Sequence, residues 1–260
     1  MNKIHNTAKD KFIAYNQYKS NRKKVPYVIF LHGLMSDMSG IKALHIENHC
    51  KNKDYNFIRF DNFGSGNSSG NFIDETIGSW LEGLELVLDQ LITGEVVLIG
   101  SSMGGWVAML AALKYPAIIK ALIGIAPAID FTEEAIWQKL PKTAQKKMMK
   151  EGQLDVSGSG SDCSDSYPIS YKLIEEARKH LLLNQDVIDL KIAVHLIHGM
   201  QDKDVPYTIS TRLLSKIKGE NIVLKLIKDG GHRLSSPWDL NIITNSIDEV
   251  MNKFSGESTT

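Results

Sequence analysis

The feature that most constrains this chain is a glycine-rich turn between an apolar run and a helix-like segment. Residues 96–99 (VVLI) are typical of a buried parallel strand, and residues 106–113 of a helix. Between them, Gly-Ser-Ser-Met-Gly at 100–104 fits G-x-S-x-G, with Ser102 at the centre. So sharp a turn strains its central residue and excludes side chains two positions away, while Gly105 lets the helix approach the sheet. The pattern also occurs as a plain tight turn, so its interpretation depends on the rest of the chain.

Short apolar segments alternate with helical patterns along the whole chain, which predicts an α/β fold with a mostly parallel central sheet and helices on both faces. We expect one domain over residues 1–260 with an inserted cap at 131–190. The residues around His5 are expected to fray. The expected strands are 12–18 (an edge strand), 27–33, 56–61, 96–99, 121–128, 194–199 and 223–227, and the expected helices are 41–51, 79–91, 106–113 and 240–254.

The expected cap contains two helical patterns, 135–150 and 171–183, separated by a polar stretch at 158–168 that predicts a mobile loop or a hairpin tip. Four of its apolar side chains are candidates to line a pocket for an acyl chain, although packing inside the cap is the stronger expectation for most of them. They are Trp137, Leu140, Met148 and Met149.

Charge and cysteine content exclude several classes of protein. Thirty basic and thirty acidic side chains cancel, so no net field favours nucleic acid or an anionic membrane. Cys50 and Cys163 fit a reducing compartment and have no metal-ligand spacing. The first twelve residues lack the apolar core of a signal peptide, and no apolar run approaches the roughly 20 residues that span a bilayer. We therefore expect a cytoplasmic protein without stable membrane insertion, whose oligomeric state stays open.

A serine hydroxyl is a weak nucleophile and needs a base within hydrogen-bond reach. In folds that carry G-x-S-x-G, an acid and then a histidine follow the serine along the chain. Asp202, in a turn after the strand at 194–199, is the favoured acid, and Asp204 is the second choice. His232, preceded by two glycines after the last expected strand, is the favoured base. His198 is expected to help shape the turn that carries the acid.

An acyl-transfer site also needs two backbone N–H groups directed at the developing oxyanion. Met103 follows the serine directly, and Leu34 follows a buried strand that ends in His-Gly, so both are expected donors. The glycine-rich loop at 61–70 lacks the lysine of a nucleotide-binding loop. His45 and His49 share one helix face without a third ligand, so surface or packing roles are expected. The chemistry requires no metal or organic cofactor.

These motifs resemble those of the α/β-hydrolases over essentially the whole chain. Longer stretches at 34–43, 57–70, 76–82, 98–106 and 197–206 are similar to the family of the mitochondrial palmitoyl-protein thioesterase, also named mycophenolic acid acyl-glucuronide esterase, and its bacterial relatives. The resemblance implies hydrolysis of acyl esters or thioesters, small or linked to protein, through an acyl-serine at Ser102. The family's acid and base map onto Asp202 and His232.

Three alternatives remain open on the same fold. A proline-releasing serine peptidase would use acidic cap residues to hold a substrate amino terminus, and Glu133 and Glu134 are candidates. A binding protein without catalysis usually lacks one member of the triad. A carbon–carbon bond hydrolase would act only on diketones.

Overall fold

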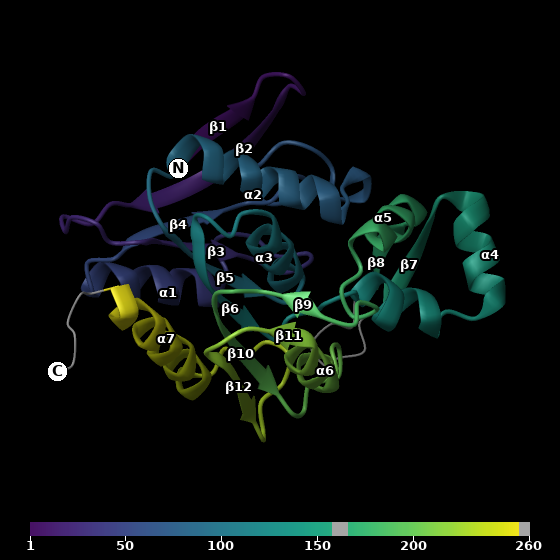
Figure 1. Ribbon diagram of the computed structural model, residues 1–260. Coiled ribbons are helices and arrows are strands. Elements are labelled where there is room, and N and C mark those ends of the chain that lie inside the picture. The colour runs from purple at the N-terminus through teal and green to yellow at the C-terminus, as the bar shows by residue number, and fades with distance from the viewer. Residues whose placement is uncertain (158–165, 255–260) are drawn as a thin grey trace.

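The computed structural model describes residues 1–157 and 166–254 (Figure 1). An eight-stranded sheet has the order β1-β2-β4-β3-β5-β6-β10-β12. Strand β2 pairs antiparallel with both of its neighbours, and every other pairing in this sheet is parallel, which confirms the predicted fold class. The strands are β1 (Asn2–Asn6), β2 (Lys11–Tyr18), β3 (Tyr27–Leu31), β4 (Asn56–Phe60), β5 (Val96–Ser101), β6 (Ile119–Ile125), β10 (Ala193–Gly199) and β12 (Ile222–Ile227).

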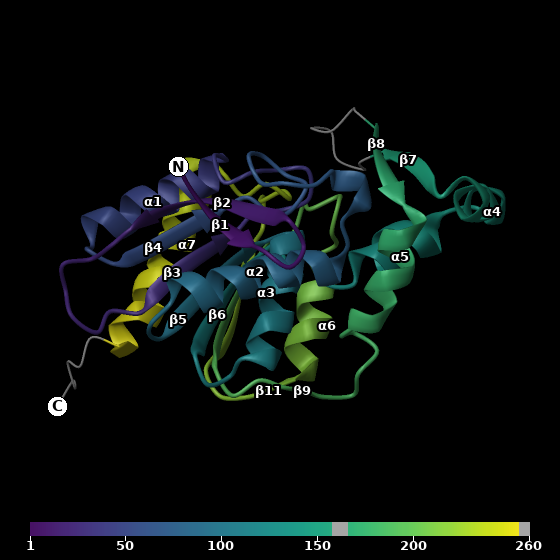
Figure 2. The same cartoon turned by 90° about the horizontal axis from the view of Figure 1, so that it is seen from above.

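Helices cover both faces of the sheet, as Figure 2 shows from above. One hydrophobic core lies beneath α2, α3 and α6, and a second lies beneath α1 and α7. Strand β5 is buried along its whole length because it lies between these two cores. The helices are α1 (Ile41–Asn52), α2 (Ile77–Leu91), α3 (Met103–Lys114), α6 (Thr208–Lys216) and α7 (Pro237–Met251).

The amino terminus differs from the prediction. Residues around His5 do not fray but form β1, which pairs with β2 along Asn2–Asn6. The segment expected as an edge strand is therefore second in the sheet. Its partner was missed because NKIHN has a single buried apolar residue, Ile4, and no clear alternation.

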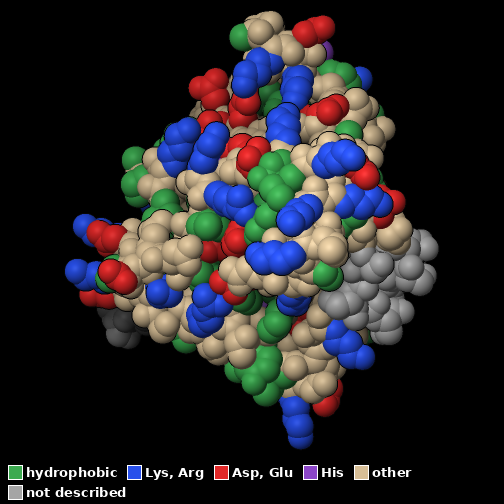
Figure 3. Space-filling model, turned by 90° about the vertical axis from the view of Figure 1, so that its right-hand side faces the viewer, with side chains coloured by type: hydrophobic (Ala, Val, Ile, Leu, Met, Phe, Trp, Pro, Cys, Tyr) green, Lys and Arg blue, Asp and Glu red, His purple; other side chains and the backbone are tan. Residues whose placement is uncertain are grey.

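The cap segment, expected at 131–190, projects beyond the ends of the strands (Figure 1). The predicted helix at 135–150 is broken, because Pro141 precedes α4 and disfavours a helical conformation at the residue before it. Lysine and arginine side chains are scattered over this end of the molecule (Figure 3). The cap comprises a π-helical turn (Thr132–Ile136), a 3-10 turn (Trp137–Lys139), α4 (Lys142–Glu151), β7 (Gln153–Ser157), β8 (Ser166–Ser170), α5 (Tyr171–Ala177) and a second 3-10 turn (Arg178–His180).

Strands β7 and β8 form an antiparallel hairpin. Most of the polar stretch predicted as a loop or hairpin tip, residues 158–165 with Cys163, lies outside the described residues. Two short strands, β9 (Ile188–Asp189) and β11 (Ile217–Lys218), pair with each other where the chain returns to the main sheet. Among the helices in the described ranges, none has the length and apolar character needed to cross a bilayer.

Candidate active site

Ser102 occupies a strained turn between β5 and α3. Its φ of 53° and ψ of −121° lie outside the regions that most residues adopt. A Cβ at position 100 would collide with the backbone of Gly104, and one at position 104 would lie 2.5 Å from the Leu31 carbonyl oxygen. The two glycines of the motif are therefore required by backbone packing, and the turn presents the Ser102 side chain at the carboxyl end of the sheet.

A chain of hydrogen bonds links the serine to a histidine and an aspartate. The Ser102 hydroxyl lies 3.0 Å from His232 Nε2, and His232 Nδ1 lies 2.7 Å from Asp202 Oδ2. Because a carboxylate only accepts, Nδ1 carries the proton and Nε2 is free to accept from the hydroxyl. Asp204, the second choice for the acid, instead donates its backbone N–H to Asp202 Oδ1 at 3.0 Å.

Asp202 is buried and receives several further donors. His198 Nε2 lies 3.1 Å from Oδ2, and the Val205 N–H lies 2.8 Å from Oδ1. Burial alone would raise the pKa of Asp202, but hydrogen bonds from His198, His232 and the Val205 N–H hold it well below its usual range. The acid therefore stays ionised. His198 is itself fixed by Ser210, whose hydroxyl lies 2.7 Å from Nδ1, in agreement with the role expected for this histidine.

The two expected oxyanion donors belong to segments that meet at Ser102. Leu34 and Met103 both line the cavity that contains the serine. The loop before Leu34 is held by His32, whose Nδ1 lies 2.8 Å from the Gly33 carbonyl and whose Nε2 accepts from the Asn62 N–H at 3.0 Å. Burial lowers the pKa of His32, which fits a neutral imidazole that donates through one nitrogen and accepts through the other.

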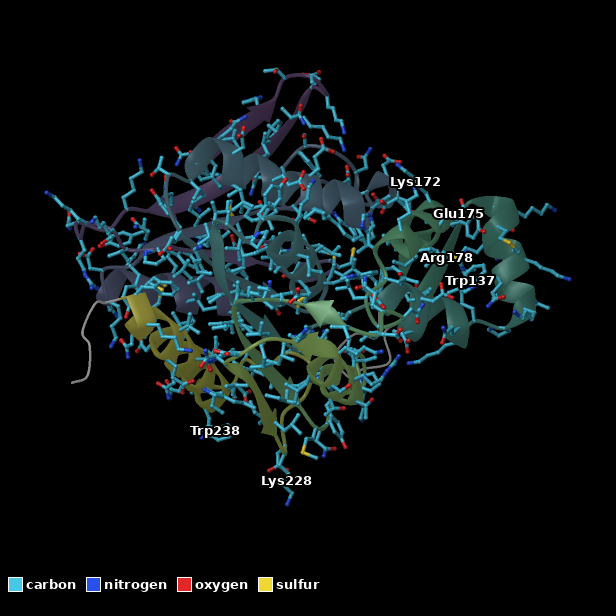
Figure 4. All side chains as sticks on the ribbon, in the orientation of Figure 1. Trp137, Lys172, Glu175, Arg178, Lys228 and Trp238 are labelled. Atoms are coloured by element: carbon cyan, nitrogen blue, oxygen red, sulfur yellow. The ribbon has the colours of Figure 1, made fainter. Side chains whose placement is uncertain are left out.

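A cavity of about 900 Å³ lies above Ser102, between the sheet and the cap. Of the four side chains named as pocket candidates, Leu140 lines this cavity, whereas Trp137, Met148 and Met149 are not among the described residues that do. Met148 is fully buried inside the cap, and Trp137 packs against the Tyr171 ring and the Arg178 guanidinium (Figure 4). Apolar residues of the cap segment that line the cavity and were not predicted to do so include Phe131, Ala135, Ile136 and Val156.

The remaining candidate residues are engaged elsewhere. Glu133 pairs with Arg178, and Glu134 binds Arg212 through both carboxylate oxygens, so neither presents a free carboxylate for an amino terminus. His49 Nε2 lies 2.9 Å from Asp248 on α7, which is the packing role expected for it.

The glycine-rich loop at 61–70 is organised by the buried Asp61 carboxylate. That carboxylate accepts the backbone N–H groups of Met38 and Asn67 at 2.7 and 2.8 Å. Among the described residues, one group has ligand atoms close enough for a metal ion. It comprises Asp202, Asp204 and His232, within 4.8 Å of one another, and two of these residues already share the hydrogen bond described above.

Comparison with known proteins gives concordant matches. The family model described as serine aminopeptidase, S33, matches residues 22–236. The chain is 35% identical over 238 residues to palmitoyl-protein thioesterase ABHD10, mitochondrial, of Bos taurus, covering 92% of this chain and 77% of the bovine protein. Mouse ABHD10 has a solved structure that is 33% identical, with a TM-score of 0.89 over 98% of this chain and 99% of the mouse chain. A putative hydrolase of Agrobacterium vitis S4 is 31% identical, with a TM-score of 0.90 over 96% and 97% of the two chains.

Proposed function

This chain belongs to the serine aminopeptidase S33 family of α/β-hydrolases, and from that membership we propose that it is a serine esterase or thioesterase that forms an acyl-enzyme at Ser102. The observation that carries the proposal is the unbroken hydrogen-bond chain from Ser102 through His232 to Asp202, at the base of a cavity with an apolar side. The relatives named as palmitoyl-protein thioesterases support acyl substrates.

In the proposed reaction, Ser102 Oγ attacks the acyl carbonyl carbon while His232 Nε2 takes the hydroxyl proton. The N–H groups of Leu34 and Met103 stabilise the oxyanion. Collapse of the tetrahedral intermediate breaks the bond to the leaving alcohol or thiol, which receives the proton from His232. Water, deprotonated by the same histidine, then attacks the acyl-serine and releases the carboxylic acid.

The test is kcat/KM for acyl esters and acyl thioesters of increasing chain length, with Ser102→Ala beside the wild type. We expect turnover of both classes, and in the variant a loss of kcat on the order of 10⁴-fold or more, because the covalent step has no nucleophile. Covalent labelling of the wild type by a fluorophosphonate should disappear in the same variant. Near-normal turnover by Ser102→Ala would overturn the proposal. Activity on dipeptides alone would favour a peptidase.

A further inference from the structure

Lys42 lies at the start of α1 and lines the same cavity as Ser102 and His232. Its ammonium group donates a hydrogen bond to the backbone carbonyl oxygen of Arg233, the residue that follows His232. Lys42 is thus held on the His232 side of the cavity. Its side chain is charged, whereas the cap contributes apolar side chains.

The positive charge of Lys42 has no matching negative charge. Lys42 is partly buried, and within the described residues no carboxylate forms an ion pair with its ammonium group. Burial, together with the neighbouring Arg233 charge, lowers the pKa of Lys42 to about 8, and Asp239 opposes this shift only in part. The Asp239 carboxylate accepts a hydrogen bond of 2.7 Å from the Ser236 hydroxyl, at the N-terminus of α7. A partly desolvated ammonium bound to one neutral acceptor favours an anion that arrives with the ligand.

The start of α1 adds to the positive potential at this side of the cavity. Gly40 begins the helix without a side-chain cap, and the first turn contains no acidic residue. Three carboxylates that also line the cavity lie on other segments. Asp37 is exposed and accepts the Ser39 N–H at 2.6 Å, and Asp155 is exposed on β7. Asp204 lies beside Asp202 and His232, and its backbone N–H donates to Asp202 Oδ1.

The histidine of a serine hydrolase gives its proton to the leaving group, so the leaving group lies on the His232 side. We propose that Lys42 determines specificity by binding a carboxylate or phosphate group carried by the alcohol or thiol part of the substrate. This inference rests on the proposed esterase or thioesterase function and adds to it the chemical class of the leaving group. Lys42 recognises that group and takes no part in bond breaking.

Three butyrate esters with related phenols test the inference. Their leaving groups are meta-hydroxybenzoate, its neutral methyl ester, and meta-hydroxyphenyl phosphate. For the wild type we expect kcat/KM for an anionic ester to exceed that for the neutral ester by about 10-fold, the effect of one hydrogen bond to a charged group. Lys42→Met should abolish this ratio through KM while retaining turnover of the neutral ester. Lys139→Met removes an exposed lysine that lines the cavity from the cap, and should retain the ratio.

The outcomes separate the inference from the function on which it rests. Preference for the carboxylate or for the phosphate supports the inference and identifies which anion is bound. A ratio unchanged by Lys42→Met overturns it, even if all three esters are turned over. An equal loss on charged and neutral esters in Lys42→Met also overturns it, since that result assigns Lys42 to holding the His232 loop. If the wild type hydrolyses none of the esters, the proposed function itself fails.

Discussion

Two histidines donate to one carboxylate at the centre of the candidate site. His232 and His198 both approach Asp202 Oδ2, at 2.7 and 3.1 Å. His198 Nε2 also lies 2.9 Å from the Val205 carbonyl oxygen, so this nitrogen faces only acceptors and must carry a proton. The second histidine therefore holds the acid in place and keeps it ionised without reaching the substrate.

Replacing His198 with phenylalanine should weaken the site without removing the triad. We expect kcat to fall about 10-fold, since Asp202 loses one hydrogen bond to its charged form. A carboxyl with a lowered pKa stabilises the fold above its unfolded-state pKa and loses that contribution as pH falls. The stability deficit of the variant relative to wild type should therefore shrink only as pH falls below about 4, toward the lowered pKa of Asp202. Urea unfolding at about pH 4 and at about pH 2.5 measures this.

Ser210→Ala is the matched control for that substitution, because it removes only the outer hydrogen bond to His198 Nδ1. A kcat equal to wild type in His198→Phe would show that the function of Asp202 does not depend on the hydrogen bond from His198.

At the scale of the elements, hydrogen bonds to Asp130 join the two ends of the cap. It follows β6 with a φ of 56°, and its buried carboxylate accepts the N–H groups of Leu182 and Leu183 at 3.0 and 2.7 Å. Burial raises the pKa of Asp130 to about 6, although these two hydrogen bonds partly oppose the shift. The same contact explains why the helical pattern predicted at 171–183 ends early, because the chain turns to meet Asp130.

Asp130→Asn should change how stability depends on pH. The pKa of Asp130 is about 6 in the folded protein against an ordinary 3.8, so the folded protein binds the proton more tightly than the unfolded chain does. The contribution of Asp130 to wild-type stability therefore falls as pH rises from 3.8 to about 6. The stability of the variant relative to wild type should therefore improve, by at most about 3 kcal/mol, between about pH 4 and pH 7. Denaturant titrations of both proteins at several pH values test this, with Asp155→Asn as an exposed control. If the free energies of unfolding of Asp130→Asn and wild type change with pH in parallel, the prediction is wrong.

Elements with strong apolar periodicity were predictable, and elements fixed by contacts distant in sequence were not. Strand β5 and the helix after Ser102 follow from the local pattern, since burial on both faces requires an uninterrupted apolar run. Strand β1 depends on pairing with β2, and the π-helical turn at Thr132–Ile136 depends on how the cap packs. Neither has a local signature in the sequence.

At the scale of the whole molecule, the cavity exists only because the cap lies over the sheet. Ala135 lines it from the π-helical turn, where a larger side chain would fill space directed at the acyl group. Ala135→Trp should therefore reduce kcat/KM for long acyl chains by at least about 10-fold while sparing acetate esters. Gln138→Trp, at an exposed neighbouring position, should leave the chain-length profile unchanged. Equal losses on short and long chains in Ala135→Trp would argue against an acyl pocket on this side.

The proximity of Ser102, Asp202 and His232 could be predicted because each lies in a short motif that follows a strand. The cavity lining could not, because it is assembled from segments far apart in the chain. Lys42 meets Arg233 across 191 residues, and no spacing rule relates them. Trp137 was a plausible pocket residue by composition, but the break before α4 turns it toward Tyr171 instead.

The order of the triad along the chain has a consequence for synthesis. Ser102 is followed by its base only after 130 further residues. At translation rates of about 5–20 residues per second, the Ser102 hydroxyl would exist for roughly 6.5 to 26 s before His232 is added to the chain. Throughout that interval the emerging polypeptide lacks His232, the base proposed for Ser102. On the proposed mechanism, a growing chain therefore cannot form an acyl-serine until the segment after β12 has been made and His232 reaches Ser102.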